Sequence, residues 1–318
     1  MIDARPPGRA VRAIKPLRTE VVHIGHDRDV AEIEQQRAAF AARLPRLLRE
    51  LSADWGLVAD GRPQQGASSL VVPVRRGAEA AVLKLAFPDD DSEHEALALQ
   101  KWAGRGSAQL LSADPHRRAL LLERLRPTDL TSVDVLGACE VVARSYARLH
   151  VPALPQLRTL TSYVARRTDD LVRLPRDAPV PHRLVQQAVS LGREQAGGAA
   201  GDAVLLHGDL HYAHVLAGER EPWLVIDPAP LSGHPHYEIA PMLWHRWDEV
   251  VASGDVRTAV RRRFHTLVDG ALLDEDRARD WVVVRAMHHA LRELEEHPRA
   301  PDHDHLTRCI AIAKAVQD

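Results

Sequence analysis

The chain has 318 residues, 45% of them hydrophobic and 27% charged, a length that suits roughly two domains and a core that needs no disulfide or metal support. The 42 basic and 44 acidic residues leave a formal charge of −2, which offers no support for binding nucleic acid or an anionic membrane. There is no apolar run near the roughly 20 residues of a membrane helix, no signal-peptide core, and only Cys139 and Cys309 as cysteines, so the sequence excludes a membrane protein and a disulfide-rich secreted miniprotein and indicates a cytoplasmic one.

The first part of the chain predicts a small α+β lobe behind a basic arm. Residues 1–22 are basic with little periodicity, so we expect a loose N-terminal arm, with a targeting segment as the minor alternative. Apolar residues at helical spacing predict a helix over 29–51. Further elements follow, namely strands at 68–74, 80–87 and 119–125, with a helix at 92–102. Strands gathered around one helix predict a lobe over 23–123.

The remainder, 124–318, is predicted to be mostly helical. Apolar residues recur at helical spacing from Leu136 to Leu149 and from Trp281 to Leu294. Two strand-like runs interrupt this part, at 203–206 and 223–226, and each ends in polar sequence that contains His or Asp. Proline-rich stretches at 152–155 and 176–181 predict loops, and no internal repeat is present.

Lys84 is a candidate phosphate-binding residue. Only four of the 42 basic residues are lysines, a bias typical of GC-rich coding sequence that favours a bacterial source. Lys84 lies inside the apolar run Ala-Ala-Val-Leu-Lys-Leu-Ala-Phe, where a charge is costly unless it reaches solvent or a partner. A compact ammonium suits a phosphate oxygen. The alternative is an outward-facing lysine on a half-exposed strand.

Glu95 is the candidate partner of Lys84. Leu99 and Trp102 follow it at i+4 and i+7, which places Glu95 on the apolar face of its helix. A carboxylate there needs a cation, and Lys84 is the nearest candidate in sequence. Two alternatives stay open: Glu95 lies on the rim of that face, or Glu93 is the partner instead.

Residues 204–244 carry the strongest signal for chemistry. The segments Val-Leu-Leu-His-Gly-Asp-Leu-His-Tyr-Ala-His-Val-Leu and Pro-Trp-Leu-Val-Ile-Asp-Pro each deliver an aspartate at the end of a strand, Asp209 and Asp227. The offset of 18 residues from the first to the second allows a hairpin-like excursion that returns the second aspartate beside the first. Paired carboxylates suit one general base and one metal ligand. The alternative is two unrelated turn aspartates.

These residues resemble a known family. His207-Gly208-Asp209, with Asp227 after Val-Ile, is similar to the catalytic and metal motifs of kinase-like small-molecule phosphotransferases. Leu-His-Tyr followed by Val-Leu-Ala, Arg-Glu-Pro-Trp-Leu and Ile-Asp-Pro resembles the streptomycin 6-phosphotransferase and hydroxyurea phosphotransferase branch of the aminoglycoside phosphotransferases. Upstream segments match in type and order, namely 69–74, 83–85 and 121–125. The resemblance covers about 45–300 and is most specific in 204–244.

The resemblance implies a fold and an activity. The fold is a two-lobed, protein-kinase-like α+β structure with a small β-rich N-lobe, a larger mostly helical C-lobe and a hinge near 123–127. The activity is phosphorylation of a hydroxyl on a streptomycin-like antibiotic, and hence antibiotic resistance, with ATP and Mg²⁺ (or Mn²⁺) as cofactors. Hydroxyurea is a second acceptor associated with this branch. The partner is therefore a small molecule, and no feature of the sequence indicates an oligomeric state.

The resemblance also implies a role for each site residue. Lys84 holds the α/β-phosphates and pairs with Glu95, and the turn at Gly66-Ala67-Ser68 covers the nucleotide. Backbone groups near Glu123 and Leu125 meet the adenine. Asp209 accepts the proton of the substrate hydroxyl, and Asp227 ligates Mg²⁺. Such sites work mainly through positioning and charge neutralisation.

Two positions depart from the family pattern. His214 stands where the family has an asparagine that serves as a second Mg²⁺ ligand, five residues after the catalytic aspartate. The sequence Gly233-His234-Pro235 replaces the common Gly-Asp-Pro. Mg²⁺ prefers oxygen, whereas imidazole suits Zn²⁺ and other transition metals. A nucleotide-binding pseudokinase with little turnover is therefore an alternative.

A zinc hydrolase is the less favoured rival. Five histidines join Asp209 and Asp227 as potential transition-metal ligands, namely His207, His211, His214, His234 and His236. That reading leaves Lys84 and Glu95 unexplained. The helical part also carries acidic residues that could attract a cationic acceptor, although solvated helix faces explain them as well: Asp248, Glu249, Asp274, Glu275, Asp276 and Asp280.

Overall fold

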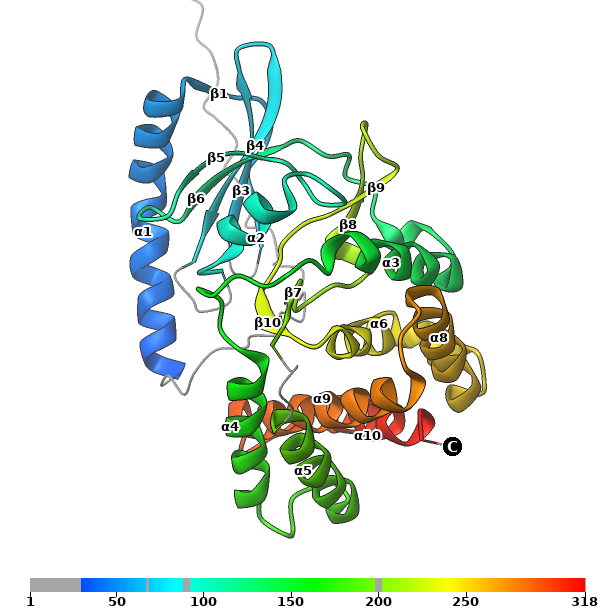
Figure 1. The fold of residues 1–318 in the computed structure, drawn as a ribbon. Coiled ribbons are helices and arrows are strands. Elements are labelled where there is room, and N and C mark those ends of the chain that lie inside the picture. The colour runs from blue at the N-terminus through cyan, green and yellow to red at the C-terminus, as the bar shows by residue number, and fades with distance from the viewer. Residues whose placement is uncertain (1–29, 67–68, 88–91, 198–201, 318) are drawn as a thin grey trace, which may run out of the picture.

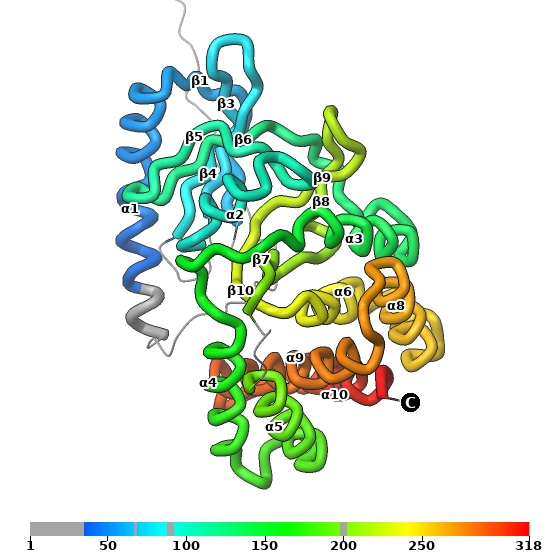
Figure 2. The backbone as a smooth tube through the Cα atoms, viewed as in Figure 1, coloured from blue at the N-terminus to red at the C-terminus, as the bar shows by residue number. Residues whose placement is uncertain are grey.

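The computed structural model has two parts, a sheet with two flanking helices and a larger helical body (Figure 1). It describes residues 30–66, 69–87, 92–197 and 202–317, and side chains from residue 35 onwards. The predicted arm at 1–22 lies outside the described residues. The backbone trace shows the helices α4, α5, α9 and α10 gathered at the end of the molecule away from the sheet (Figure 2). This is the two-lobed α+β fold expected from the sequence.

The first part is built on an antiparallel sheet of six strands in the described residues, in the order β1-β3-β4-β6-β5 with β2 paired to β3. The strands are β1 (Leu57–Ala59), β2 (Gln64–Gln65), β3 (Ser69–Arg76), β4 (Glu79–Ala86), β5 (Leu110–Asp114) and β6 (Ala119–Glu123). The three strands expected from the sequence are β3, β4 and β6, each within a few residues of the predicted bounds. The short strands β1, β2 and β5 lack a clear alternating pattern and were not predicted.

Two helices cover the two faces of this sheet. α1 (Val30–Trp55) lies along one side (Figure 1) and runs four residues beyond the predicted helix end at 51. Its Leu47 and Leu51 pack with Leu83 and Leu121 in one buried cluster. α2 (Glu95–Trp102) begins three residues later than predicted, and its apolar residues join a second cluster with strand residues of opposite parity, Leu120 and Leu122. Alternate strand residues therefore face different cores.

Strand alternation also decides the direction of Lys84. Leu83 and Leu85 belong to the core beneath α1, so Lys84 points to the opposite face of the sheet, the face covered by α2. Lys84 pairs across the ladder with Leu120, whose side chain lies in the second core. One lysine in an apolar strand is thus directed away from α1 and toward the rest of the molecule.

The second part is mostly helical. Its helices are α3 (Val135–Leu149), α4 (Leu160–Arg173), α5 (His182–Ala196), α6 (Ala240–Trp244), α7 (Trp247–Ala252), α8 (Val256–Ala271), α9 (Glu275–Glu296) and α10 (His303–Ala315), with single 3₁₀ turns η1 (Leu130–Ser132), η2 (Tyr212–His214) and η3 (Pro235–Ile239). Two antiparallel pairs interrupt the helices, β7 (Val204–Leu206) with β10 (Leu231–Gly233) and β8 (Val215–Ala217) with β9 (Trp223–Val225). Among the described residues, no helix is both long and apolar enough to cross a membrane.

Polar residues begin several of these helices by capping free N–H groups. The capping side chains, each accepting from a backbone N–H of the first turn, are Asp134, Thr159, Asp255, Asp274 and Asp302. Other acidic residues of this part form ion pairs within their own helix or next to its start, namely Glu249 with Arg246, and Glu275 and Asp276 with Arg279. Most of the acidic residues noted in the sequence therefore have local structural roles.

The two parts share a continuous core. Trp102 of α2 is fully buried and donates from its indole nitrogen to the Leu149 carbonyl at the end of α3, at 2.8 Å. The sheet ends at Glu123, and the Arg126 amide donates to Ala217 of β8. Cys139 and Cys309 are buried and form no disulfide. The hydrogen bond from Arg126 to Ala217 places the connection between the two parts beside the β8–β9 hairpin.

Candidate active site

The loop after β7 has a backbone conformation that only glycine accepts at its centre. Gly208 has φ +83°, in the left-handed region. A Cβ atom there would overlap the Ala229 carbonyl oxygen. Because that oxygen belongs to the backbone, it cannot move aside to relieve the overlap. The sequence His-Gly-Asp therefore turns sharply and delivers Asp209 directly after a buried strand.

Two buried charged residues, Glu238 and Arg285, form hydrogen bonds with the backbone of this loop. The fully buried Glu238 carboxylate accepts from the Gly208 N–H at 2.6 Å and from His150 Nε2 at 3.0 Å. Burial is the largest single effect and acts to raise the pKa of Glu238, but the hydrogen bond and charge of His150, the charge of His207 and the Gly208 N–H together outweigh it, so the pKa is lowered. Arg285 donates to the Gly208 carbonyl at 2.5 Å and to Tyr237 at 2.7 Å. Both peptide groups of the loop's glycine are therefore fixed by buried charges.

Neither Glu238 nor Arg285 was singled out in the sequence. A signal was present: Glu238 interrupts the apolar run Tyr-Glu-Ile-Ala-Pro, and Arg285 interrupts Val-Val-Val-Arg-Ala-Met. A charge in such a run needs a buried partner. Their partners include the backbone groups of Gly208, and they lie on distant parts of the chain, which sequence spacing does not reveal.

Asp209 is buried with one free carboxylate oxygen. Its exposed fraction is 3%. Its Oδ1 has no hydrogen-bond partner among the described residues, and its Oδ2 lies 3.9 Å from both His211 Nε2 and His214 Nδ1. A buried acceptor oxygen without a donor is costly unless a ligand supplies one. The arrangement suits acceptance of a proton or hydrogen bond from an incoming hydroxyl.

His214 links the two aspartates predicted to lie together. Its Nδ1 is 2.8 Å from the Asp209 carbonyl oxygen, and because a carbonyl only accepts, Nδ1 carries the hydrogen. The lone pair is then on Nε2, which faces Asp227 Oδ2 at 4.0 Å. The Ile226 amide donates to the His214 carbonyl at 2.9 Å, next to the β8–β9 hairpin. The chain between the two aspartates forms the β8–β9 hairpin, as expected, and His214 lies within 4.0 Å of both carboxylates.

Asp227 itself has a left-handed backbone, φ +60°, at the end of β9. Its carboxylate contacts the Lys84 ammonium directly and is 40% exposed. Burial is the largest single effect and acts to raise the pKa of Asp227, but the charge and hydrogen bond of Lys84, together with the charges of His214 and His207, outweigh it and hold the pKa at about 2. The group is therefore an anion at any physiological pH, with one oxygen turned toward His214.

The ion pair expected between Lys84 and Glu95 is present. Lys84 Nζ lies 2.7 and 2.6 Å from the two Glu95 oxygens, and Glu95 is 2% exposed. Burial opposes the lysine charge, but Asp227 and Glu95 together raise the pKa of Lys84 above its ordinary value. Lys84 is thus not an outward-facing lysine, Glu95 is not on a rim, and Glu93 instead lies 3.7 Å from His94.

The positions expected to contact a nucleotide base lie at the end of β6. The Glu123 N–H donates to the Gln109 carbonyl at 3.0 Å, and its carboxylate binds Arg220 at 2.6 Å. A base contact at Glu123 would therefore have to use its carbonyl oxygen. Leu125 is partly exposed just beyond the strand. Ser68, expected to cover the nucleotide, lies outside the described residues.

Arg220, which was not singled out in the sequence, joins several segments of the hinge region through hydrogen bonds. From the turn between β8 and β9 it donates to the carbonyl oxygens of Gly104 and Ser107 as well as to Glu123. Its neighbour Glu221 binds Arg148 of α3 at 2.9 Å. The hairpin that carries Asp227 is therefore anchored to both parts of the molecule.

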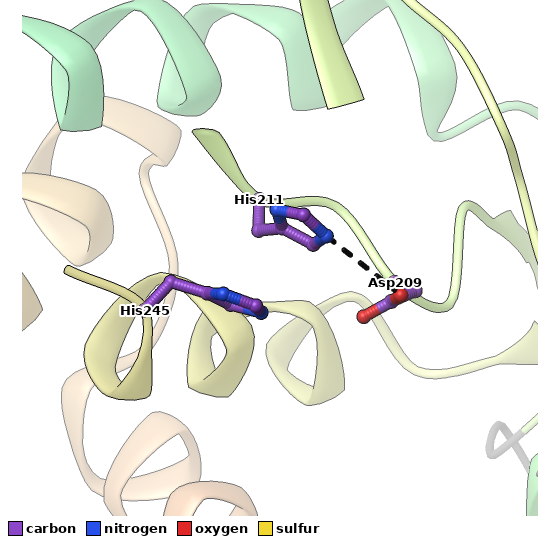
Figure 3. A group of neighbouring side chains, drawn as sticks. All are labelled: Asp209, His211 and His245. Atoms are coloured by element: carbon purple, nitrogen blue, oxygen red, sulfur yellow. Dashed lines mark ion pairs between the residues drawn. The ribbon is translucent and has the colours of Figure 1, made fainter. Parts of the chain in front are cut away.

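The seven-residue metal set considered in the sequence is not one site. His234 and His236 contact each other at 2.9 Å, and their other nitrogens face Arg277 and the Asp274 amide. The group that comes together among the described residues is Asp209, His211 and His245, with ligand atoms within 4.8 Å of one another (Figure 3). The zinc-hydrolase hypothesis was therefore wrong about His234 and His236 and missed His245.

This geometry defines a class. A lysine of the sheet pairs with a glutamate of a helix and faces an aspartate that follows a hairpin. A glycine-aspartate loop lies next to them and is held by the helical part. This is the arrangement of a kinase-like small-molecule phosphotransferase. Residues 54–296 match the family model of the aminoglycoside/hydroxyurea antibiotic resistance kinases. The chain belongs to this family.

Individual relatives agree over most of their length. The chain is 40% identical to a streptomycin 6-kinase of Streptomyces glaucescens, over 89% of this chain and 92% of the relative. It is 35% identical to a hydroxyurea phosphotransferase of Kitasatospora aureofaciens, over 93% and 88%. A crystal structure of an aminoglycoside phosphotransferase with ADP and hygromycin B aligns with a TM-score of 0.57 at 16% identity, over 85% of this chain and 98% of that one, and supports the fold. An active phosphotransferase is favoured over a pseudokinase or a zinc hydrolase.

Proposed function

We propose that this protein transfers the γ-phosphoryl group of ATP to a hydroxyl of a streptomycin-like aminoglycoside and so confers resistance. The observation that carries the proposal is the buried, unpartnered Oδ1 of Asp209, in a loop linked through His214 to Asp227 and Lys84. The 40% identity to a streptomycin 6-kinase supports this acceptor class.

Asp209 is the proton acceptor in this proposal. The hydroxyl oxygen forms a bond to the γ-phosphorus while the bond to the β–γ bridging oxygen breaks, and ADP leaves with that electron pair. The hydroxyl proton passes to Asp209 Oδ1. Glu238 and Arg285 fix the peptide groups of Gly208, so the carboxylate is oriented before the acceptor arrives.

The nucleotide would be held by the first part of the chain. Lys84 would contact the α/β-phosphates with Glu95 as its anchor, and backbone groups of Glu123 and Leu125 would face the adenine. In this proposal residues 23–123 form the nucleotide-binding lobe, and 124–318 form the lobe that carries the catalytic loop and the acceptor site.

The donor set between Asp227 and His214 fits one divalent cation. Asp227 Oδ2 offers an anionic oxygen and His214 Nε2 a lone pair, 4.0 Å apart. Bound there, a cation would neutralise charge on the phosphates, with phosphate oxygens and water completing its shell. Asp227 suits Mg²⁺, whereas the imidazole of His214 suits Mn²⁺ better.

Hydroxyurea is the second candidate acceptor because of the 35% identical relative that is named for it. A cytoplasmic location agrees with two cysteines that form no disulfide and with the need for ATP.

A panel of acceptors tests the proposal. Purified full-length protein is incubated with ATP and Mg²⁺ or Mn²⁺ and with streptomycin, hygromycin B, other aminoglycosides or hydroxyurea, and product mass is measured. We expect streptomycin to gain one phosphoryl group and ADP to form in equal amount. Phosphorylation of hydroxyurea alone would move the assignment to that acceptor. No phosphorylated product with any acceptor would refute the proposed function.

A further inference from the structure

Asp209, His211 and His245 form a three-residue cluster that phosphoryl transfer does not require as a unit. Figure 3 shows the His211 ring lying over the His245 ring, with both rings directed toward the Asp209 carboxylate. The ring centroids are 3.9 Å apart and the ring planes differ by 19°. His245 follows α6, far from any motif in the sequence, and is not part of the proposed catalytic machinery.

We propose that this cluster is a transition-metal site, best suited to Zn²⁺, whose occupation blocks phosphoryl transfer. Two imidazoles and one carboxylate match the three protein ligands of an open zinc site, with water in the fourth position. Mg²⁺ and Ca²⁺ prefer all-oxygen sites, so they are poor occupants of this one.

The geometry requires little rearrangement. Ligand atoms at about 2.1 Å in a tetrahedral shell lie about 3.4 Å from one another. The ligand atoms of the cluster are already within 4.8 Å of one another, and His211 Nε2 is 3.9 Å from Asp209 Oδ2. Because the His211 and His245 rings are nearly parallel and both are directed toward the Asp209 carboxylate, one ion beside that carboxylate can bind a nitrogen of each ring.

The donor atoms are also available. Asp209 Oδ1 and His245 Nε2 are buried without hydrogen-bond partners among the described residues, so an ion would satisfy both. His211 Nδ1 accepts a long hydrogen bond from the Ala213 amide at 3.3 Å. Ligation through Nε2 moves the hydrogen to Nδ1 and breaks only that weak bond.

This cluster is separate from the cation position between His214 and Asp227. His214 directs Nδ1 to the Asp209 carbonyl oxygen and Nε2 to Asp227, so neither nitrogen is offered to the cluster. A metal on the Asp209 carboxylate would take the oxygen lone pairs that the acceptor hydroxyl needs. This inhibitory consequence rests on the proposed function, whereas zinc binding itself does not.

Zinc binding is measured first, without any substrate. Metal-stripped full-length protein is titrated with Zn²⁺ in competition with a chromophoric chelator. His245→Phe keeps a ring to stack on His211 and removes one ligand, and His211→Gln is an independent second variant. His214→Asn tests the neighbouring cation position, and exposed His182→Gln is the matched histidine control.

We expect the wild type, His214→Asn and His182→Gln to bind one more Zn²⁺ than His245→Phe and His211→Gln, or to bind it at least about tenfold more tightly. Circular dichroism identifies a variant that has lost its fold, and the remaining ligand variant then decides. Equal stoichiometry and affinity in wild type and the folded ligand variants would overturn the proposal.

Inhibition is measured second, with free Zn²⁺ fixed by a metal buffer and Mg-ATP in excess. We expect wild-type transfer to fall as the site fills, and His245→Phe to retain transfer up to at least about tenfold higher Zn²⁺. Wild-type protein that binds Zn²⁺ through the cluster and still transfers at full rate would overturn the inhibitory part and count against Asp209 as proton acceptor. Absence of transfer with every acceptor would count against the proposed function alone, because the titration is read without it.

Discussion

Lys84 and Asp227 lie 143 positions apart and form a direct ion pair, while the same ammonium binds both oxygens of Glu95. One cation thus joins the sheet, helix α2 and the end of the β8–β9 hairpin. This pair brings together the groups proposed to bind phosphate and metal. In the proposed reaction, the phosphate oxygens and the cation would compete with the contact between Lys84 and Asp227.

Glu95→Gln tests the anchoring of Lys84. An amide cannot balance the ammonium, so Lys84 should shift fully to Asp227 and contact phosphate less well. We expect kcat/KM for ATP to fall about 10- to 100-fold, the equivalent of one lost charged hydrogen bond. Steady-state kinetics at varied ATP provide the measurement. Glu93→Gln, two positions away beside His94, is the control and should leave kcat/KM unchanged; equal values for both variants would contradict the role of Glu95.

Gly208→Ala tests the loop conformation. Gly208 combines φ +83° with backbone contact at the missing Cβ position, so alanine should unfold the loop and abolish transfer. Gly254→Ala is a matched control, because Gly254 has φ +74° with open space around it and should lose only about 1 kcal/mol of unfolding free energy. Thermal and denaturant unfolding measure both. Equal destabilisation would show that left-handed strain alone, and not the contact with Ala229, restricts position 208.

His214→Asn tests the cation position. Neutral imidazole offers nitrogen where an amide would offer oxygen, so Mg²⁺ should neutralise the γ-phosphate poorly. A loss of about 2 to 3 kcal/mol there slows transfer by about 30- to 150-fold. We expect the wild type to be faster with Mn²⁺ than with Mg²⁺, and His214→Asn to raise the Mg²⁺-dependent rate and shrink the Mn²⁺ advantage. Identical rates and metal preference in the two proteins would exclude a ligand role for His214.

Sequence patterns were sufficient for the parts of the site that rest on local spacing. Asp209 and Asp227 follow buried strands, and Lys84 and Glu95 each interrupt an apolar face, so these four residues were predictable from the pattern, whereas His214 was singled out through the family resemblance. His245, Glu238 and Arg285 were missed because their partners come from distant elements: His245 meets the cluster only through packing of α6. The strands β1, β2 and β5 were missed because a short or irregular strand leaves too few alternating residues to recognise.

Buried histidines should make the protein acid-sensitive. Burial lowers the pKa of His288 to about 3, from an ordinary value of 6.5. Between these values the unfolded chain binds more protons than the folded one, so the free energy of unfolding is fully retained above pH 6.5 and falls as the pH drops toward 3. Each such residue contributes a slope of about 1.4 kcal/mol per pH unit.

His288→Phe should remove one titrating group from the pH dependence of the free energy of unfolding. Denaturant unfolding of wild type and variant at several pH values between 4 and 6.5 gives the slopes, and the variant's slope should be smaller by up to about 1.4 kcal/mol per pH unit. Parallel curves for wild type and His288→Phe would show that His288 is protonated equally in both states.

Asp209 is proposed to accept the proton in phosphoryl transfer to a streptomycin-like hydroxyl. The most direct measurement compares wild type and Asp209→Asn for ATP binding by calorimetry and for phosphorylated streptomycin by mass spectrometry and phosphorus NMR. We predict one phosphoryl group added by the wild type, with the Asp209→Asn rate lower by about 100- to 10,000-fold and ATP affinity unchanged. Near-normal turnover by Asp209→Asn, or loss of ATP binding together with activity, would contradict this assignment.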